Sequence, residues 1–398
     1  MNIMIITPNL SGGGAEKIAA NLSLELANRS NLYVLTYMTD EKEYDFAGTR
    51  ININCSGRGG IQKLFCAVKR IFMCKKAIKK YHIDCVISFL PQTDYVNVLS
   101  KSKKNKSIIT IVSNMSLVYP SGFGKKFRKF VIKHADHVVC VSEGVRQDIV
   151  ENFGCLPQKS SVIYNSCNIS DIKQVCDNDI EYQENKNNLP KKYIVSMGSF
   201  RHPKGHWHLI KAFASVKDEI PDVSLVILGD GVYRKQYEEL INNLALEGRV
   251  YLPGFINPPF SIIAHSELFV FSSVFEGFGN AVIEAIACKI PVLSTDCDYG
   301  PREILAPGTS LKDKAYKFQK CEYGCLIPDF GQEPIDTSEN INAAEKEMGE
   351  SIKELLNNEE LRREYSQKGI SYVEKFDNEV FTENWIELIN NLIGEQNG

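Results

Sequence analysis

Short apolar runs alternate with longer stretches of helical spacing along all 398 residues of the chain. A short continuous apolar run bounded by turn residues is typical of a strand that is buried on both faces. Strands separated by helices in this way predict two doubly wound α/β domains with parallel sheets. We expect the strands at residues 3–7, 31–36, 85–89, 107–112 and 137–141, and again at 193–197, 223–228, 250–252, 268–271 and 291–294.

The composition along the chain suggests where the two domains meet. Residues 171–192 are rich in Asn, Asp, Glu and Lys and contain no predicted strand, which indicates a linker region. The linker would join a first domain of residues 1–170 to a second domain of residues 193–375. Residues 376–398 carry an amphipathic pattern around Trp385, which predicts a C-terminal helix.

The bulk composition limits the class of protein. The chain is 43% hydrophobic and 24% charged, which is typical of a soluble globular protein. No apolar run approaches the roughly 20 residues that span a bilayer, and we interpret the N-terminal MNIMIITPNL as a buried strand rather than a signal peptide. The 12 cysteines lack the spacing of a disulfide framework or a metal site, so we expect reduced thiols in a cytoplasmic protein.

The net charge of −3 conceals a difference between the two halves. Residues 1–170 hold 23 Lys and Arg against 12 Asp and Glu, a net charge of +11, and the rest of the chain has a net charge of −14. A basic first domain favours an anionic ligand or surface as its partner. We expect no nucleic acid among the partners.

Three glycines, Gly12, Gly13 and Gly14, follow the first predicted strand and precede a helical pattern. They would let the backbone approach a ligand closely at the positive end of the helix dipole. The simplest alternative is a tight strand-to-helix turn. A dinucleotide fingerprint is not expected, because Lys17 stands where its third glycine belongs and the second predicted strand, NLYVLTYMTD, ends differently.

Two further loops follow predicted strands of the second domain. The segment GSFRHPKG places Arg201 and Lys204 on a loop bounded by glycines, which suits a diphosphate, although exposed cations are more often only solvated. The segment EGFGNAVIE places Glu276 and Glu284 around a glycine turn, and residues 281–288 would form a helix with Asn280 as N-cap.

The two acids can accept hydrogen bonds from hydroxyl groups, while the turn between them supplies backbone N–H groups. A ligand with hydroxyls at both ends and a charged middle is a nucleotide-sugar. The alternative is a helix whose acids only complement its dipole. The N–H groups that would form an anion nest belong to Gly277, Phe278, Gly279 and Asn280.

At these residues the chain resembles the family 4 retaining glycosyltransferases. EGFGNAVIEAIACKIPVLSTD is similar to the E-x7-E segment of that family, and the resemblance covers nearly the whole chain. It implies the GT-B architecture of two facing Rossmann-like domains, with the C-terminal helix crossing back to the first domain. Four more segments follow in the family's order: SGGGAEK, ADHVVCVSEGVRQDI with SVIYNS, GSFRHPKG, and STDCDYGPREIL.

The resemblance also implies roles. The enzyme would move a hexose or N-acetylhexosamine from a nucleotide-sugar, UDP-linked in our expectation, to a saccharide acceptor. Glu284 would bind the donor ribose, and Glu276 would contact the donor sugar near its anomeric carbon. The nest after Glu276 would hold sugar and phosphate, and Lys204 would neutralise the leaving β-phosphate. Gly13 and Gly14 would close over the diphosphate from the first domain.

Two positions depart from the family pattern. Ser199, in the donor-binding loop, replaces a common Arg, and Arg201 would compensate from two residues further on unless it is only solvated. Many members have a His after the fourth strand of the first domain. Residues 109–116 contain none, so no catalytic His is assigned, and Asn114 is the residue that could stand in.

The segment from Asp296 to Asp298 imitates the metal-binding DxD motif of the other transferase fold, but it follows a strand of the second domain. We therefore expect a loop there, and an enzyme with no metal and no cofactor. Two alternative functions remain: a UDP-sugar epimerase of the same fold, and a non-catalytic partner that binds sugar nucleotides. Both glutamates and Lys204 are present, which weighs against the non-catalytic partner.

Two basic-apolar clusters in the first domain concern the acceptor. Either could lie on an anionic membrane surface, at the cytoplasmic face, with an acceptor on a lipid diphosphate as in surface-polysaccharide assembly. The alternative is that the apolar stripes are core and the lysines a solvated rim. The first stripe is Ile61, Leu64, Phe65, Val68, Ile71 and Phe72 among seven Lys and Arg, and the second cluster is KKFRKFVIK at residues 125–133.

Overall fold

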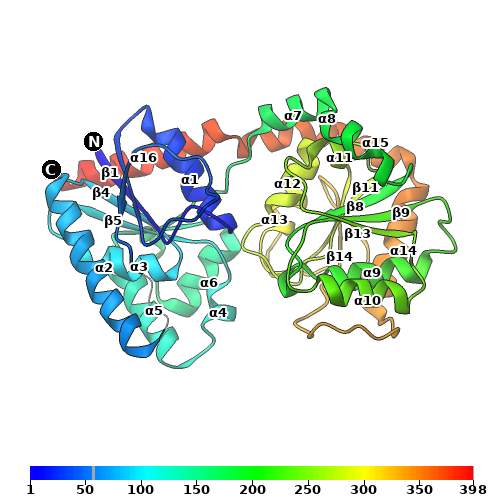
Figure 1. Ribbon diagram of the computed structural model, residues 1–398, viewed down its shortest axis with the longest axis horizontal. Helices are drawn as coiled ribbons and strands as arrows, with labels where there is room; N and C mark the ends of the chain where they lie inside the picture. Colours follow the sequence, from blue (N-terminus) through cyan, green and yellow to red (C-terminus); the bar gives the residue numbers. More distant parts are fainter. Residues whose placement is uncertain (56–58, 398) are drawn as a thin grey trace. The chain divides into compact units, whose positions relative to one another are not determined.

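The computed structural model describes residues 1–55 and 59–397, and the side chains up to residue 394 (Figure 1). The chain divides into two compact units. The first unit comprises Met1–Ser166 together with the residues from Asn378 on, and the second comprises Cys167–Asp377. Each unit is built around its own seven-stranded sheet.

The first unit has a parallel sheet in the order β3-β2-β1-β4-β5-β6-β7. Its strands are β1 (Asn2–Thr7), β2 (Asn31–Thr36), β3 (Thr49–Asn52), β4 (Cys85–Phe89), β5 (Lys106–Ile111), β6 (His137–Cys140) and β7 (Ser160–Val162). Its helices are α1 (Gly14–Ala27), α2 (Gly60–Lys80), α3 (Pro91–Ser100), α4 (Met115–Val118), α5 (Gly122–His134), α6 (Glu143–Phe153) and α16 (Asn378–Asn397), with a 3₁₀ turn at Pro157–Lys159.

Helices cover both faces of this sheet, as the continuous apolar strands predict. One core cluster joins α1 and α16 to the sheet, and another joins α2 and α3 to it. The C-terminal helix therefore packs on the first unit, beside α1 (Figure 1), as expected. It buries Phe381, Trp385 and Ile389, and the ring of Trp385 lies 6.4 Å from that of Phe89 on β4.

The second unit has a sheet in the order β10-β9-β8-β11-β12-β14-β13, parallel except for β13 at one edge. Its strands are β8 (Tyr193–Met197), β9 (Ser224–Leu228), β10 (Val250–Gly254), β11 (Leu268–Phe271), β12 (Val292–Thr295), β13 (Gln319–Lys320) and β14 (Cys325–Ile327). Its helices are α7 (Ile169–Asn178), α8 (Ile180–Asn185), α9 (His206–Val216), α10 (Arg234–Asn243), α11 (Phe260–Ala264), α12 (Asn280–Ala287), α13 (Pro301–Leu305), α14 (Ala343–Asn357) and α15 (Glu359–Val373), with 3₁₀ turns at Lys186–Asn188, His202–Lys204 and Glu374–Phe376.

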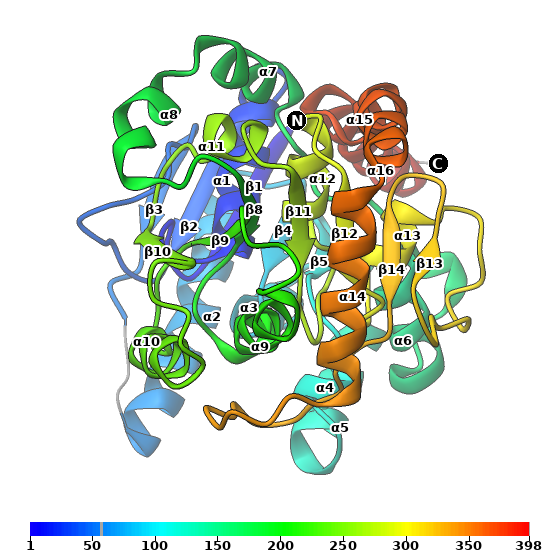
Figure 2. The ribbon, with the colours of Figure 1, turned by 90° about the vertical axis from the view of Figure 1, so that its right-hand side faces the viewer.

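The core of this unit contains the fully buried Trp207 on α9. Helices α9 and α14 pack against each other on one face of the sheet (Figure 2), and Gly349 permits their close contact. A Cβ at Gly349 would lie only 2.6 Å from the carbonyl oxygen of Ala212. The predicted fold class, two doubly wound α/β units, is confirmed.

The expected linker is placed differently. Residues 171–192 do not form an extended connection, because most of them fold as α7 and α8 within the second unit. Helix α7 is not polar on all sides: Ile172 is buried, as is Ile169 just before the segment, and α7 packs on α11 and α12. The sequence did not predict the strands β3, β7, β13 and β14. Each has only two to four residues, too few to show a periodic pattern of apolar positions.

Strand order determines which loops become neighbours. In the second sheet the chain places β9 on one side of β8 and β11 on the other, so the loops after β8 and β11 leave the same edge in opposite directions. Such a switch point opens a crevice outside the carboxyl ends of the strands, where open α/β sheets bind ligands. Among the described helices none has the length and apolar character to cross a membrane.

Candidate functional site

The loop after β8 and the loop after β11 are held together by close backbone contacts. Gly205 ends the first loop with φ +58°, and a Cβ there would lie 2.2 Å from the carbonyl oxygen of Ser272. The backbone N–H of Val274 donates to the carbonyl oxygen of Pro203 at 2.9 Å. Only glycine combines this backbone conformation with so close an approach, so Gly205 lets the two loops meet.

Lys204 and Glu276, predicted from separate motifs, meet at this junction. Lys204 Nζ lies 2.6 Å from Glu276 Oε1, and the Ser273 hydroxyl donates to the same oxygen at 2.7 Å. The two charged side chains are 25% and 14% exposed, so the pair is partly shielded but open to a ligand. Glu276 Oε2 accepts no hydrogen bond from any residue that the structure describes. The carboxylate is thus fixed by one oxygen and leaves the other for a ligand hydroxyl.

The backbone around Glu276 is fixed from a third loop. The N–H of Glu276 donates to the carbonyl oxygen of Asp298 at 2.6 Å, and Tyr299 N–H donates to the carbonyl oxygen of Glu276 at 3.1 Å. Asp298 in turn pairs with Lys314 at 2.5 Å. Asp296 is buried and pairs with Arg302. The two acids of the DxD-like segment therefore hold the loop that supports Glu276.

The glycine turn after Glu276 leads into α12. Gly279 has φ +96° and is the N-cap residue, and the helix begins at Asn280, so our assignment of Asn280 as N-cap was wrong by one residue. The left-handed conformation at this cap is one that glycine adopts without strain, which explains the shift. Phe278 is buried, and Glu284 lies one turn into α12, half-buried. First-turn N–H groups lack intrahelical acceptors, so this turn has the polarity of an anion nest.

Other predicted residues are more open. Ser199 and Arg201 are exposed, and Arg201 forms no ion pair with any residue in the described ranges. In the first unit, Gly13 is the N-cap residue of α1 and Gly14 its first residue. A Cβ on Gly14 would meet nothing within 4 Å. The Gly14 position is therefore open, whereas a Cβ on Gly13 would lie 2.2 Å from the carboxylate of Glu16.

Asn114 has a structural function. Its side-chain oxygen accepts a hydrogen bond from the N–H of Leu117 at 3.0 Å, and the residue is the N-cap of α4. It is 4% exposed. The oxygen is therefore used by the helix that follows β5.

Sequence reasoning missed Ser273 and Phe271, and it missed the role of Gly205. Lys204 Nζ lies 5.6 Å from the centre of the Phe271 ring, near enough for a cation–π contact. Ser273 could have been suspected, because hydroxyl residues directly after a buried parallel strand lie at the ligand edge of the sheet. The role of Gly205 depends on a contact between two loops, which the spacing of residues along the chain does not predict.

His206 lies two residues after Lys204 and is buried among aromatic rings. Its ring is 5.6 Å from that of Phe200 and 6.0 Å from that of Tyr237. Burial, with a smaller effect from Lys204, lowers the pKa of His206 to about 3. The histidine therefore adds no positive charge to the site at neutral pH.

This shift predicts a pH-dependent stability. The unfolded chain takes up a proton at His206 near pH 6.5, whereas the folded unit stays unprotonated there until about pH 3. The contribution to stability is complete above pH 6.5 and is lost as the pH falls below it, at up to about 1.4 kcal/mol per pH unit. We expect His206→Phe to reduce the slope of unfolding free energy against pH by the amount that corresponds to about one proton. Urea unfolding at several pH values checks this, and an identical slope in variant and wild type would contradict it.

Comparisons with known proteins agree with the geometry. The model of the family described as Glycosyltransferase Family 4 matches residues 12–171, and that of Glycosyl transferases group 1 matches residues 177–315. An uncharacterised glycosyltransferase of Methanocaldococcus jannaschii is 31% identical over 83% of this chain and 84% of its own.

A second relative has a named activity. The N-acetylgalactosamine-N,N'-diacetylbacillosaminyl-diphospho-undecaprenol 4-alpha-N-acetylgalactosaminyltransferase of Campylobacter jejuni is 30% identical over 93% of this chain and 94% of its own. Among solved structures, Anabaena HepE in complex with UDP and glucose has a TM-score of 0.76, with 16% identity over 98% of this chain and 100% of that chain. At that identity the likeness shows the fold.

Proposed function

This chain belongs to glycosyltransferase family 4 and is a glycosyltransferase, and we propose that it transfers a hexose or N-acetylhexosamine from a UDP-sugar to a lipid-diphosphate-linked saccharide with retention of anomeric configuration. The observation that carries the proposal is the junction of Lys204, Glu276 and Ser273 at the switch point of the second sheet. It places a cation beside an oriented carboxylate, on loops where a nucleotide-sugar would lie.

The donor would lie along the predicted series of groups. The diphosphate would lie near Lys204 and the turn of Gly277, Phe278, Gly279 and Asn280, and Ser199 and Arg201 come from the same loop as Lys204. Glu276 Oε2 accepts a sugar hydroxyl. Glu284, one turn into α12, accepts the ribose hydroxyls. In the first unit Gly14 offers its backbone N–H to phosphate oxygens, while Gly13, whose N–H donates to the carbonyl oxygen of Ser11, permits close approach of the backbone. Each role is a part of the proposal that a variant can test.

The chemistry then needs little proton transfer by the protein. A bond forms between the acceptor oxygen and the anomeric carbon, and the bond from that carbon to the β-phosphate oxygen breaks. The electron pair goes to the leaving diphosphate, which also takes up the hydroxyl proton. Lys204 stabilises the charge that develops on the phosphate, and Glu276 stabilises the positive sugar centre. No metal is required in this scheme, because the cations of the chain and the backbone dipoles receive the charge.

The proposed acceptor sets the place of action. A saccharide on a lipid diphosphate resides at a membrane surface, and a nucleotide-sugar donor is a cytoplasmic metabolite. We therefore propose that the enzyme works at the inner face of the membrane without spanning it. The Campylobacter relative, whose name states a diphospho-undecaprenol acceptor, supports this choice of acceptor class.

A donor screen tests the proposal directly. Free UDP-sugars and GDP-sugars are added to the purified protein, and the melting temperature is followed. A ligand that binds only the folded state stabilises it by about 2.7 kcal/mol at 100 times its Kd. We expect UDP-sugars to raise the melting temperature in wild type and not in Lys204→Met. If only GDP-sugars raise the melting temperature, the donor is a GDP-sugar and not a UDP-sugar. If no nucleotide-sugar raises it, the proposal is rejected.

Glu284→Ala should separate binding from chemistry. Loss of a charged acceptor for the ribose hydroxyls is expected to raise the donor KM about 10–100-fold, at the 1.5–3 kcal/mol that hydrogen bonds to charged groups contribute. The kcat should change little, because the ribose does not react. Glu247→Ala, at an exposed position in the same unit, is the matched control. A large fall in kcat with unchanged donor affinity would show that Glu284 acts at the reacting centre.

A further inference from the structure

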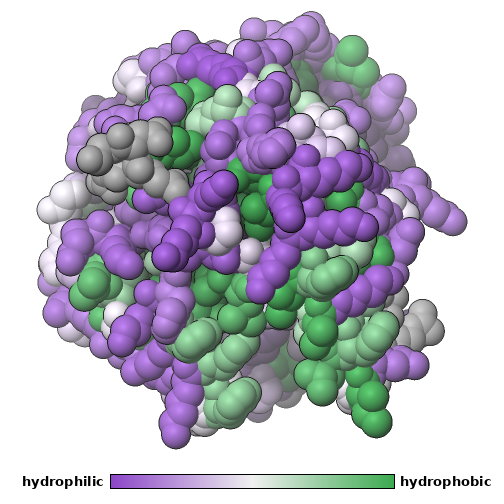
Figure 3. Space-filling model, turned by 90° about the vertical axis from the view of Figure 1, so that its left-hand side faces the viewer, coloured by the Kyte–Doolittle hydropathy of each residue, from purple (hydrophilic) through white to green (hydrophobic). Residues whose placement is uncertain are grey.

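Helices α2 and α5 of the first unit expose an unusual number of large apolar side chains. On α2, Phe65 and Phe72 are 67% and 66% exposed, and on α5 Phe123 is 81% exposed. Figure 3 shows apolar side chains gathered toward the lower end of this face of the unit. We call the set the α2–α5 surface: Ile61, Leu64, Phe65, Val68 and Phe72 of α2, and Phe123, Phe127 and Phe130 of α5.

The alternative in which these stripes form the core is therefore wrong for most of their residues. The buried residues of α2 are Cys66, Cys74, Ala77 and Ile78, on the opposite face of the helix. Soluble monomers rarely expose a contiguous apolar patch larger than a few hundred Å², and larger patches mark interaction sites. The exposed stripe thus indicates an interaction site.

The two helices are attached to the same neighbouring helix. Both pack against α3, and the ring of Tyr95 on α3 lies 6.1 Å from that of Phe127. Helix α5 is fixed by a buried ion pair between Arg128 and Asp94, 2.6 Å long, with side chains 4% and 0% exposed. Because its inner face is anchored in this way, α5 presents its phenylalanines outward in the folded unit.

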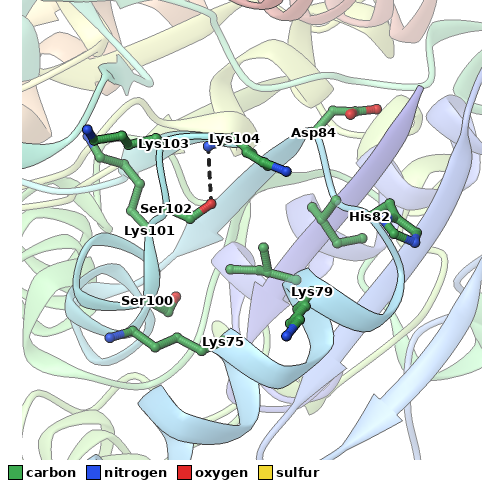
Figure 4. A pocket seen from close by; sticks show the side chains of 11 residues that line it. Lys75, Lys79, His82, Asp84, Ser100, Lys101, Ser102, Lys103 and Lys104 are labelled. Carbon is green, nitrogen blue, oxygen red and sulfur yellow. Dashed lines mark hydrogen bonds between the residues drawn. The ribbon is translucent and has the colours of Figure 1, made fainter.

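The charged residues of the two helices are all positive. Helix α2 contains seven Lys and Arg, α5 contains five, and neither contains an Asp or Glu. Along α2 the apolar stripe passes into Lys75 and Lys79 at helical spacing. These two lysines line a pocket of about 950 Å³ together with Lys101, Lys103 and Lys104 from the loop before β5 and one acid, Asp84 (Figure 4).

One end of the surface lies towards the carboxyl edge of its sheet. Helices α2 and α5 begin after β3 and β5, so their first residues are at the carboxyl edge. The glycine loop after β1 leaves that same edge, because all strands of this sheet are parallel. A partner on the α2–α5 surface would thus be held near the loop to which we assign a role in donor binding.

We propose that the α2–α5 surface docks on an anionic lipid bilayer, with its apolar side chains entering the interface and its lysines contacting lipid phosphates. The reason for docking rests on the proposed function, whose acceptor is lipid-linked. A second copy that pairs through this same surface fits less well, because it would place like charges against each other across the interface. Only an anionic partner complements both the lysines and the apolar stripe.

A tryptophan reporter tests the docking without donor or acceptor. The two native tryptophans, Trp207 and Trp385, are 0% and 1% exposed, so neither can report a surface event. Phe72→Trp adds a reporter within the surface, and Phe255→Trp adds one at a 77% exposed position of the second unit. With vesicles of phosphatidylglycerol in phosphatidylcholine, we expect a blue shift at position 72 and none at position 255.

Vesicle sedimentation supplies the second readout. We expect Phe65→Ser with Phe72→Ser to lower the fraction bound about tenfold or more, and salt to weaken binding of the wild type. No blue shift at position 72, an equal shift at both positions, or equal binding to pure phosphatidylcholine would overturn the proposal. A dimer that these serines dissociate would assign the surface to a second copy instead. These experiments contain neither donor nor acceptor. The docking proposal can therefore be rejected while the proposed sugar transfer is upheld, and docking can be upheld while the transfer is rejected.

Discussion

Replacing Lys204 by Met should lower kcat/KM for sugar transfer by about 10²–10³-fold, the usual effect of removing one preorganised group that stabilises transition-state charge. The ammonium of Lys204 lies 2.6 Å from Glu276 and is 25% exposed, so it can meet a ligand phosphate without leaving its loop. Methionine has a similar length and no charge. Steady-state assays with a nucleotide-sugar give the value, and circular dichroism checks that the variant folds.

The control for this variant is a lysine at the other end of β8. Lys192 is exposed and precedes β8, at the edge of the sheet opposite to the site. Lys192→Met should leave kcat/KM within about twofold, as is usual for surface changes away from a site. Equal losses in both variants would show that the effect arises from net charge or folding. If Lys204→Met keeps wild-type activity, Lys204 takes no part in the reaction.

The second large effect is expected at Glu276. Glu276→Ala should lower kcat about 10²-fold or more, because it removes the carboxylate that faces the sugar and leaves Lys204 without its partner. Glu276→Gln keeps the shape and one acceptor oxygen, so its loss should be smaller. Ser273→Ala should have the mildest effect of the three, because Lys204 still holds Oε1.

The split between kcat and KM decides how Glu276 acts. A loss confined to kcat places the carboxylate at the reacting centre, whereas a loss confined to KM makes it a ground-state contact. Transfer at the wild-type rate by Glu276→Ala would reject the site. The stability of each variant is measured in parallel, so that unfolding is not mistaken for a chemical effect.

Continuous apolar strands were the most predictable part of the fold. Residues 31–36, 85–89, 193–197 and 268–271 form strands with the predicted bounds, because strands covered on both faces are apolar without interruption. Strand β3, with the sequence TRIN, could not be recognised, since four residues of mixed polarity become a strand only by pairing with β2. Short edge elements depend on tertiary contacts that no local pattern contains.

The candidate site shows the same division. Lys204 and Glu276 could be named from separate loops, but their ion pair depends on strand order and on the glycine at position 205. The position of the N-cap at Gly279 depends on a left-handed backbone conformation, which the amino-acid sequence alone does not predict. For α2 the helical spacing predicted an apolar stripe, but the sequence does not say whether another element covers it. The structure leaves Phe65 and Phe72 uncovered.

One product analysis tests the whole proposal. Purified enzyme is incubated with a UDP-sugar labelled at the anomeric carbon and with lipid-diphosphate-linked saccharides in anionic vesicles, and NMR follows the labelled carbon. We predict that the label moves to the saccharide with the anomeric configuration of the donor, with one UDP released for each transfer. Inverted configuration, or conversion of the UDP-sugar into another UDP-sugar without any transfer, would contradict it.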